Sequence, residues 1–283
     1  MVKKGSLLNI IMCQSLTKSY KGLYPFKLCT TSFIYRDAYA PNVKKLGPYL
    51  DEIELLLFES KPGCLPKKNE INELSLISKE FDLTYNIHLP TDISFGHKDP
   101  SVRKNAVETI LRVLDLASPL SPSTCTLHLS SDEVSREKEN VIRWQELTCE
   151  TIKQLINFGV KAEEISIENL NYPFKWVEDI VREFNFTLCM DIGHLIVYDV
   201  DINKFYNSYC ENISIIHLHG VENGRDHLSL ERLPKERAGG IIKILKKFTK
   251  TVSLEVFSYD DLMTSLKFFE KCWNKFDGVV KSL

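Results

Sequence analysis

The sequence predicts an α/β protein in which eight parallel strands alternate with eight helices and close into a (β/α)8 TIM barrel. Three observations favour this fold class. An apolar or β-branched run followed by an amphipathic segment recurs eight times along the chain. The repeats span about 250 residues, the usual size of such a barrel. No predicted strand is followed by a glycine-rich nucleotide-binding loop, which counts against the alternative of a doubly wound open sheet.

The strands are predicted from short runs of β-branched and apolar residues. In chain order they cover residues 27–35, 52–58, 84–89, 125–129, 165–170, 187–192, 213–219 and 252–257. The helices are predicted from amphipathic segments between these runs. They cover residues 41–50, 69–81, 99–117, 137–158, 174–184, 202–209, 235–248 and 259–273. We therefore expect one barrel domain over residues 25–283, preceded by a short N-terminal extension over residues 1–24.

The composition is that of an ordinary globular chain, with 43% hydrophobic and 26% charged residues in a length of 283. Lys3 and Lys4 precede an apolar stretch as in an export signal, but Asn9 interrupts that stretch and no small-residue cleavage site follows. No apolar run approaches the ~20 residues of a membrane-spanning helix. The eight cysteines are scattered without a C-x-x-C pair, so we expect a cytoplasmic protein without membrane association.

The charge balance bears on possible partners. The chain carries 36 basic and 38 acidic residues, a net charge of −2. Because a dedicated nucleic-acid-binding protein normally presents a basic surface, we do not expect nucleic acid to be the partner.

Six consecutive predicted strands end with a His, Asp or Glu directly after one apolar residue. These residues are His88, His128, Glu168, Asp191, His217 and Glu255. Because side chains alternate across a strand, an outward apolar residue places its charged neighbour inside the barrel, so all six would converge at one mouth. A lone buried histidine is more often a hydrogen-bonded core residue than a ligand. A cluster of six would repel and lose hydration unless a cation neutralised it, so we expect one to three divalent ions of zinc, manganese or iron.

Loops after the sixth and seventh strands add candidates at the same mouth. They are His194, His219, Arg225 and His227. Gly193 permits a tight turn before His194, and His219 lies one inward position above His217.

This order of residues resembles the xylose isomerase-like barrel superfamily, which includes sugar isomerases, epimerases and the endonuclease IV type of abasic-site nuclease. The resemblance implies that one metal is held by His88, His128 and Glu168. It implies that Glu168 bridges to a second metal, held also by Asp191, His217 and Glu255. A third metal would involve His194 and His227, but Arg225 stands where the family has an aspartate, so Asp226 is an uncertain ligand.

Several segments look like the CbiR family of cobamide-remodelling hydrolases. They are residues 30–35, 51–60, 86–92, 217–221, 224–230 and 253–257. This resemblance implies a corrinoid as the small-molecule substrate. It further implies hydrolysis of the phosphoribosyl linkage in the nucleotide loop, which releases cobinamide phosphate and the lower-ligand riboside.

In such a hydrolase, the metal makes water a nucleophile near neutral pH, and Glu168 or Glu255 orients that water or relays its proton. His219 either protonates the leaving group or hydrogen-bonds a neighbour. The planar fork of Arg225 suits a phosphate oxygen, although a loop arginine often has no such role. Tyr35, in the loop after the first strand, is expected at the rim that contacts the substrate.

Three other functions stay open. A sugar isomerase or epimerase would need only the single metal held by Glu168, Asp191, His217 and Glu255, so the pair His88 and His128 favours hydrolysis. An abasic-site endonuclease would need several Lys or Arg contacts to the phosphate backbone, against which the net negative charge argues. The third alternative is a barrel that binds metal but catalyses no reaction. It is less favoured because it does not explain why acids and imidazoles converge at the end of the barrel where catalytic residues usually lie.

Overall fold

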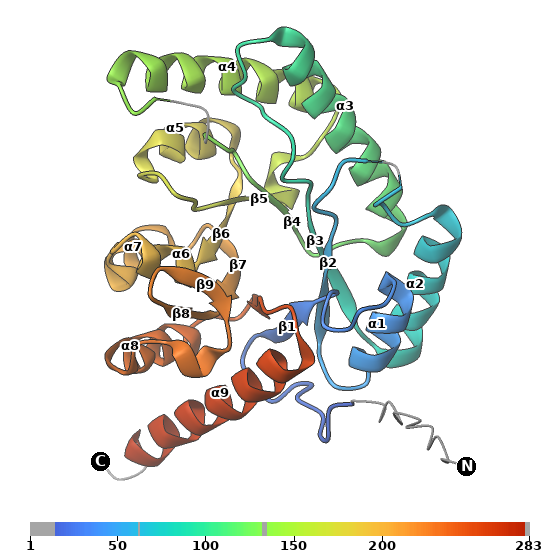
Figure 1. Ribbon diagram of the computed structural model, residues 1–283, viewed down its shortest axis with the longest axis vertical. Coiled ribbons are helices and arrows are strands. Elements are labelled where there is room, and N and C mark those ends of the chain that lie inside the picture. The colour runs from blue at the N-terminus through green and yellow to red at the C-terminus, as the bar shows by residue number, and fades with distance from the viewer. Residues whose placement is uncertain (1–14, 62, 132–134, 281–283) are drawn as a thin grey trace, which may run out of the picture.

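The computed structural model describes residues 15–61, 63–131 and 135–280 (Figure 1). The lysine pair and apolar stretch considered as an export signal lie outside these residues. No helix in these ranges is long and apolar enough to cross a membrane.

Eight parallel strands form a closed barrel, which confirms the predicted fold class. They are β1 (Lys27–Thr31), β2 (Glu52–Leu56), β3 (Thr84–His88), β4 (Cys125–Leu127), β5 (Ile165–Glu168), β6 (Thr187–Asp191), β7 (Ile213–Leu218) and β10 (Thr251–Leu254). Each strand pairs with its neighbours in the sequence of eight, and β1 closes the ring by pairing with β10. All strand ends therefore point the same way, and the loops that follow the strands share one mouth.

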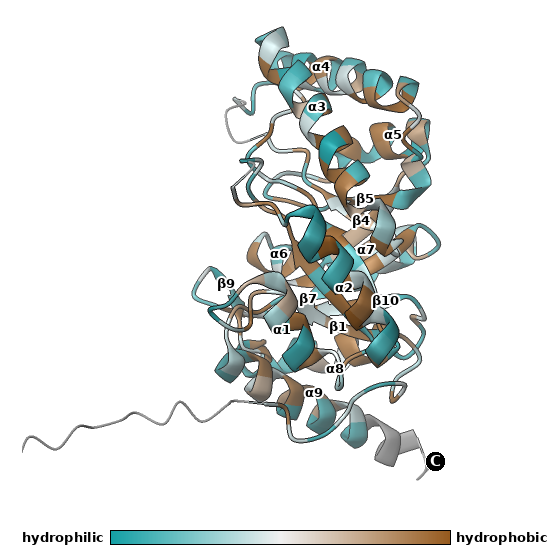
Figure 2. Cartoon of the chain, turned by 90° about the vertical axis from the view of Figure 1, so that its right-hand side faces the viewer, coloured by the Kyte–Doolittle hydropathy of each residue, from teal (hydrophilic) through white to brown (hydrophobic). Residues whose placement is uncertain are grey.

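Helices surround the barrel on its outside (Figure 1). The predicted ones are present as α1 (Tyr39–Leu46), α2 (Lys68–Phe81), α3 (Pro100–Ala117), α4 (Lys138–Asn157), α5 (Lys175–Phe184), α7 (Ile202–Tyr209), α8 (Lys235–Leu245) and α9 (Tyr259–Val280). In α2, the buried residues Ile71, Leu74 and Ile77 recur every three positions and form one face. Figure 2 shows the resulting hydrophilic and hydrophobic bands on the helices.

The alternation of side chains in β3 shows which residues enter the barrel. The Tyr85 hydroxyl donates to the carbonyl of Leu74 in α2 at 2.8 Å, so Tyr85 faces the helix layer. Asn86 faces the other way and donates to Glu52 of β2, also at 2.8 Å. His88 lies two residues further on and therefore points inward as well, as its contact with Glu168 shows.

Most predicted strands extend past their observed ends, by four residues in β1. Residues just beyond the strands, such as Leu89, Leu129 and Val256, are fully buried in the loops. An apolar run therefore continues past the point where ladder pairing stops, and hydropathy alone does not mark the boundary.

Two elements at the mouth were not predicted. Helix α6 (Ile192–Val197) begins directly after β6, and the Asp191 side chain caps it by accepting from the backbone N–H of His194 at 2.7 Å. A hairpin of β8 (Gly220–Glu222) and β9 (Arg225–Leu228) follows β7. Its turn, Asn223–Gly224, has positive φ at both residues, as a tight hairpin turn requires.

Residues 15–24 pack against the barrel domain. Leu16 and Tyr20 are buried, and the Tyr24 ring stacks on Phe26 and meets Trp273 of α9 edge-on at 5.0 Å. Figure 1 shows this segment beside α9. The described part of the N-terminal segment thus contributes to an aromatic cluster with Phe26, Phe269 and Trp273.

Candidate metal centre

The strand ends bring the six predicted side chains together inside the mouth. Five of them are less than 4% exposed, and His128 is the most accessible at 19% of its side chain. Glu168, the last residue of β5, lies at the centre of the group. One of its carboxylate oxygens, Oε2, faces three of the six predicted residues, and the other, Oε1, lies 3.3 Å from His194 Nδ1.

The first set of contacts joins Glu168 to β3 and β4. His128 Nε2 lies 2.9 Å and His88 Nε2 3.4 Å from Glu168 Oε2. His88 Nδ1 lies 3.1 Å from the carbonyl of Leu89, to which it can donate. That bond directs the Nε2 lone pair of His88 at Glu168, the arrangement in which metal-binding histidines are usually held.

The second set joins β7 and the end of β10. His217 Nδ1 lies 3.1 Å from Glu255 Oε2 and 3.7 Å from Glu168 Oε2. His217 is fully buried, as is Asp191 on the neighbouring strand β6. These side chains reach the centre from adjacent strands, because β6, β7 and β10 are consecutive in the barrel.

Buried atoms without hydrogen-bond partners show that a cation fits here. Among the described residues, His217 Nδ1, Glu255 Oε2 and His227 Nδ1 are buried and have no hydrogen-bond partner. Both imidazole nitrogens face the same Glu255 oxygen, His217 Nδ1 at 3.1 Å and His227 Nδ1 at 3.6 Å. Buried polar atoms are normally satisfied, and imidazole nitrogens and carboxylate oxygens are ligands for zinc and similar ions.

Four groups of three side chains place ligand atoms within 4.8 Å of one another. They are His88, Glu168 and His217; Glu168, Asp191 and His194; Asp191, His219 and Glu255; and His194, His219 and His227. The groups share members and form one continuous cluster, which could hold more than one ion.

The electrostatics of the cluster favour positive charge. Burial alone would raise the pKa of Glu168, but His128 and His217 outweigh it and hold that pKa well below its usual range. Burial lowers the pKa of His194, yet Asp191 and Glu168 raise it to about 10. The carboxylates therefore remain ionised and attract protons to the histidines, as they would attract a metal cation.

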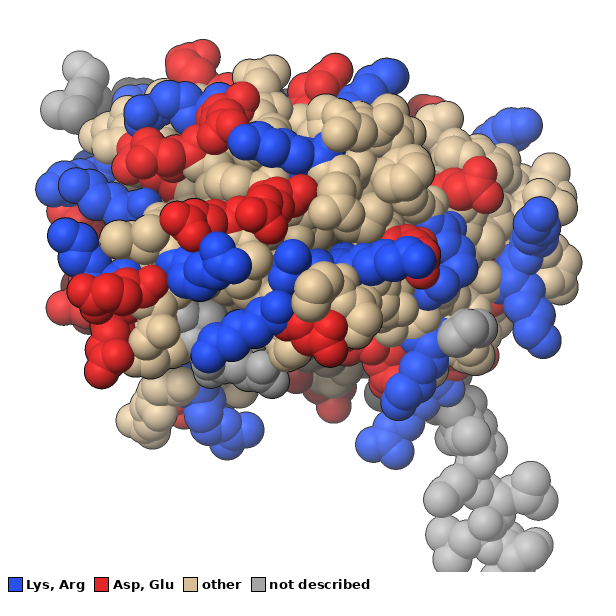
Figure 3. Space-filling model, turned by 90° about the horizontal axis from the view of Figure 1, so that it is seen from above, with Lys and Arg blue, Asp and Glu red and all other residues tan. Residues whose placement is uncertain are grey.

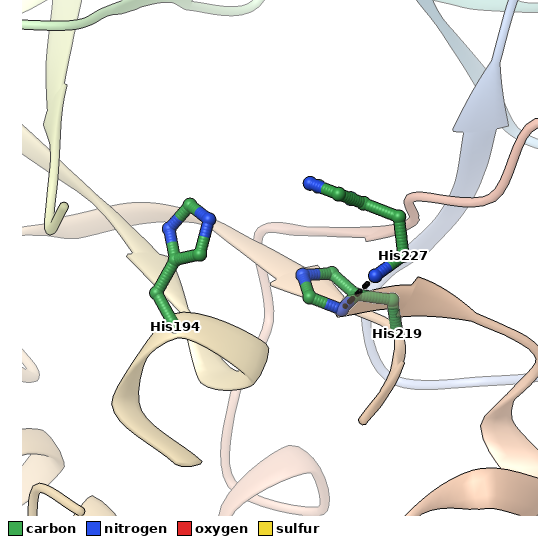
Figure 4. A group of neighbouring side chains, drawn as sticks. All are labelled: His194, His219 and His227. Atoms are coloured by element: carbon green, nitrogen blue, oxygen red, sulfur yellow. Dashed lines mark hydrogen bonds between the residues drawn. The ribbon is translucent and has the colours of Figure 1, made fainter. Parts of the chain in front are cut away.

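Figure 4 shows the three histidines at the edge of the cluster, one from α6 and two from the segment after β7. The backbone N–H of His227 donates to His219 Nδ1 at 2.9 Å, so Nδ1 is an acceptor and the ring proton is on Nε2. That proton points at Asp191 Oδ2, 3.1 Å away. Both nitrogens of His219 are therefore used within the protein. In contrast, His194 Nδ1 faces Glu168 and Asp191, and His227 Nδ1 faces Glu255.

Gly193 makes room for His219. A Cβ atom at this position would lie 1.8 Å from Cε1 of the His219 ring. His227 has φ +52°, which turns its side chain back over the hairpin toward Glu255. Asp226 Oδ2 lies 3.8 Å from His194 Nε2, so Asp226 is adjacent to the cluster although it stands directly before His227.

Two predicted substrate-binding residues lie apart from these contacts. Arg225 is exposed beside the turn of the β8–β9 hairpin. The Tyr35 ring packs between Lys45, whose Nζ lies 4.6 Å from the ring centre, and Tyr259. The structure therefore places Arg225 in solvent and Tyr35 in side-chain packing.

Two residues of the site were not predicted from the sequence. Glu54 of β2 is fully buried, with Oε1 3.0 Å from His217 Nε2. Asn169 forms two hydrogen bonds to the Asp191 backbone, at 2.9 and 3.0 Å, and its carbonyl lies 3.0 Å from His194 Nδ1. Alternation in β2 could have revealed Glu54, which faces inward like the strand-end ligands; no local pattern marks Asn169.

Comparisons with known proteins agree with this architecture. Residues 41–272 match the family described as xylose isomerase-like TIM barrel. No curated protein matches the chain significantly in sequence.

Solved structures with the same fold include epimerases and a nuclease. A D-tagatose 3-epimerase-like protein superposes with a TM-score of 0.72 at 18% identity, covering 90% of this chain and 99% of that one. D-psicose 3-epimerase from Clostridium cellulolyticum gives 0.67 at 15% identity, covering 87% and 99%. Endonuclease IV from Thermus thermophilus gives 0.67 at 15% identity, covering 88% and 99%. At these identities the similarity shows the fold alone.

Proposed function

The chain belongs to the xylose isomerase-like TIM barrel family, and from that premise we propose that it is a metal-dependent hydrolase of a phosphate ester. The substrate we propose is a cobamide, cleaved at the phosphoribosyl linkage of its nucleotide loop. One water is consumed, and cobinamide phosphate and the lower-ligand riboside are released.

The observation that carries this proposal is the position of His88 and His128 on Glu168. Their Nε2 atoms lie 3.4 and 2.9 Å from Glu168 Oε2. A single-metal isomerase would be complete with Glu168, Asp191, His217 and Glu255. The extra pair of imidazoles supplies ligands for a second ion, as in two-metal enzymes that transfer or hydrolyse phosphate.

The chain's own residues divide between two adjacent sites. His88, His128 and Glu168 would hold one ion. Glu168, Asp191, His217 and Glu255 would hold the other, and His194 and His227 could bind a third. Divalent ions in such sites act as Lewis acids that stabilise charge on phosphate oxygens and increase the acidity of water.

Glu255 is the carboxylate best placed to orient a water molecule. Oε2 of Glu255 is buried without a hydrogen-bond partner among the described residues, and His217 and His227 hold the pKa of Glu255 below its usual range despite burial, which raises it. An ionised carboxylate of this kind can orient a water molecule by accepting its hydrogen bond, whereas its lowered pKa makes it a weak base. Glu168 contacts both sets of imidazoles and would contribute ligand atoms to both sites.

His219 and Arg225 take different roles. Of the two roles expected for His219, its burial and its two hydrogen bonds support the second, a hydrogen bond to a neighbour. In this role His219 positions Asp191 and the backbone of His227. Arg225, exposed on the hairpin, can reach outward to a phosphate oxygen of the substrate. Tyr35 contributes to the rim through packing, and its contact with substrate stays a prediction.

One cavity lies between loops at the mouth of the barrel. This cavity, of about 590 Å³, lies between the loops that follow His88 and His128, and its lining includes Thr91, Ser130 and Trp144. Hydroxyl groups and an aromatic wall suit a polar, ring-containing arm of a substrate. The resemblance of several sequence segments to the CbiR family is the reason for proposing a cobamide as that substrate.

An epimerase is the second candidate, since two structures of this fold carry that name and the four ligands around Glu255 suffice for one metal. An endonuclease is less well supported. Figure 3 shows Lys and Arg interspersed with Asp and Glu on the face seen there, without a continuous basic surface.

The test is a chromatographic assay of metal-loaded protein with an adenosylated cobamide, an abasic-site duplex and a set of ketoses. We expect cobinamide phosphate to be released by the wild type and lost in Glu168→Gln. Glu163→Gln, at an exposed carboxylate before the start of the same strand, is the matched control and should keep full activity. An intact cobamide together with a nicked duplex or an epimerised ketose would refute the proposal in favour of that alternative.

A further inference from the structure

Strand β2 carries two buried carboxylates that point into the barrel, Glu52 and Glu54. Both side chains are fully buried, and they lie two residues apart, so they share the inner face of the strand. An ionised carboxylate inside a barrel is costly unless hydrogen bonds or opposite charge satisfy it. The two differ in how they are satisfied.

Glu52 belongs to a polar network away from the metal centre. Its Oε1 accepts hydrogen bonds from Asn86 at 2.8 Å, Ser123 at 2.8 Å and Thr251 at 3.0 Å. Its Oε2 lies 3.4 Å from Lys27 Nζ. Glu52 is thus fully occupied by groups that have no contact with the histidines.

Glu54 has a different partner. Its Oε2 accepts from the Ser253 hydroxyl at 2.6 Å, which anchors the carboxylate to β10. Its Oε1 lies 3.0 Å from His217 Nε2. Both atoms are buried and neither has a hydrogen-bond partner among the described residues, so this close ion-pair contact is what each of them faces. The other ring nitrogen, His217 Nδ1, faces Glu255 at 3.1 Å. The imidazole therefore lies between two carboxylates, with Glu54 on its Nε2 side and Glu255 on its Nδ1 side.

A thiol also lies close to this ring. The Cys189 thiol of β6 also interacts with His217, and burial raises the pKa of Cys189 well above its usual range. Cys189 therefore stays a neutral thiol, which is a weaker hydrogen-bonding group than a carboxylate.

We propose that Glu54 is a positioning residue: it accepts the Nε2–H of His217 and thereby directs the Nδ1 lone pair to the metal. The inference rests on the proposed metal centre but not on the identity of the substrate. Carboxylates that receive the second N–H of a metal-binding histidine fix its orientation and raise its basicity, and losing one typically lowers metal affinity by about 10- to 100-fold.

The test measures zinc and manganese binding by calorimetry in the wild type, Glu54→Gln and Glu54→Ala. Glutamine keeps the shape and an acceptor oxygen but loses the charge, so we expect affinity to fall about 10-fold, and about 100-fold for alanine. Glu52→Gln is the matched control on the same strand, and Cys189→Ala tests the thiol. Both should bind metal as the wild type does, even where their thermal stability is lower.

Nitrogen-15 NMR of the histidine rings in the zinc-loaded protein gives a second measurement. We expect the His217 signals to show a proton on Nε2 and zinc on Nδ1. Zinc on Nε2, or equal affinities for the wild type and Glu54→Ala, would overturn the inference. A wild type that binds no metal would overturn it together with the proposed function, whereas metal binding without cobamide hydrolysis would refute only the substrate.

Discussion

Gly193, in the first turn of α6, offers a sharp test of how the mouth is packed. An added Cβ would lie 1.8 Å from Cε1 and 2.4 and 2.5 Å from the two nitrogens of the His219 ring. The ring cannot move aside cheaply, because it is fully buried and bonded to Asp191 and to the backbone of His227. We therefore expect Gly193→Ala to separate α6 from the segment after β7.

The expected loss of stability in Gly193→Ala has two contributions. Overpacking a core position costs about 1–3 kcal/mol, and each of the two His219 hydrogen bonds contributes about 1 kcal/mol. We expect the free energy of unfolding to fall by about 3 kcal/mol in Gly193→Ala. Urea denaturation followed by circular dichroism measures this change.

The matched control is Gly240→Ala, at a second helical glycine. A Cβ there would meet only the Asn203 side chain at 3.7 Å, an ordinary contact. Because alanine favours helix by up to about 1 kcal/mol over glycine, this variant should be as stable as the wild type or more so. In a His219→Ala background, Gly193→Ala should lower the free energy of unfolding far less than it does in the wild type, because the ring that the added Cβ would meet is gone. The expectation is refuted if Gly193→Ala unfolds at the wild-type urea concentration.

Three further predictions concern the metal and one helix. Chelation should lower stability, by about 2.7 kcal/mol if the free metal had been at about 100 times its dissociation constant; an unchanged melting temperature would contradict a bound metal. The double variant His88→Ala, His128→Ala should lose one metal equivalent in elemental analysis while keeping the other, and loss of both or neither would contradict two separate sites. Asp99 caps α3 by accepting from the Ser101 N–H, and this bond lowers the pKa of Asp99 below its usual value. The folded state favours only the ionised form of Asp99. The difference in free energy of unfolding between the wild type and Asp99→Ala should therefore be complete above the ordinary aspartate pKa of about 4 and vanish as the pH falls through the lowered pKa. A difference that persists in strong acid would contradict this.

Local sequence was sufficient for the barrel and for its six strand-end side chains. A strand is recognisable from its own residues, and alternation then decides which side each residue faces, as with Tyr85 outside and His88 inside. Glu168 was likewise predicted to lie inside the mouth from alternation along its own strand. The boundaries were less predictable, because buried loop residues such as Leu129 continue the apolar run beyond the ladder.

Helix α6 and the β8–β9 hairpin show where local patterns were insufficient. Asp191 is both the last strand residue and the cap of the next helix, so no loop separates the two elements. The Asn223–Gly224 pair is a typical hairpin turn, but its strands are too short for a recognisable alternation.

What the sequence alone determined is therefore the kind of barrel and the residues that line its mouth, because both depend on spacing along a single strand. What only the tertiary structure decided is the pairing between strands. The contact of Glu54 with His217 joins two strands that are not neighbours in the barrel. The burial of His219 depends on Gly193 from another element. Such contacts form only when the ring closes, since closure brings together side chains whose own neighbours in the chain carry no sign of them.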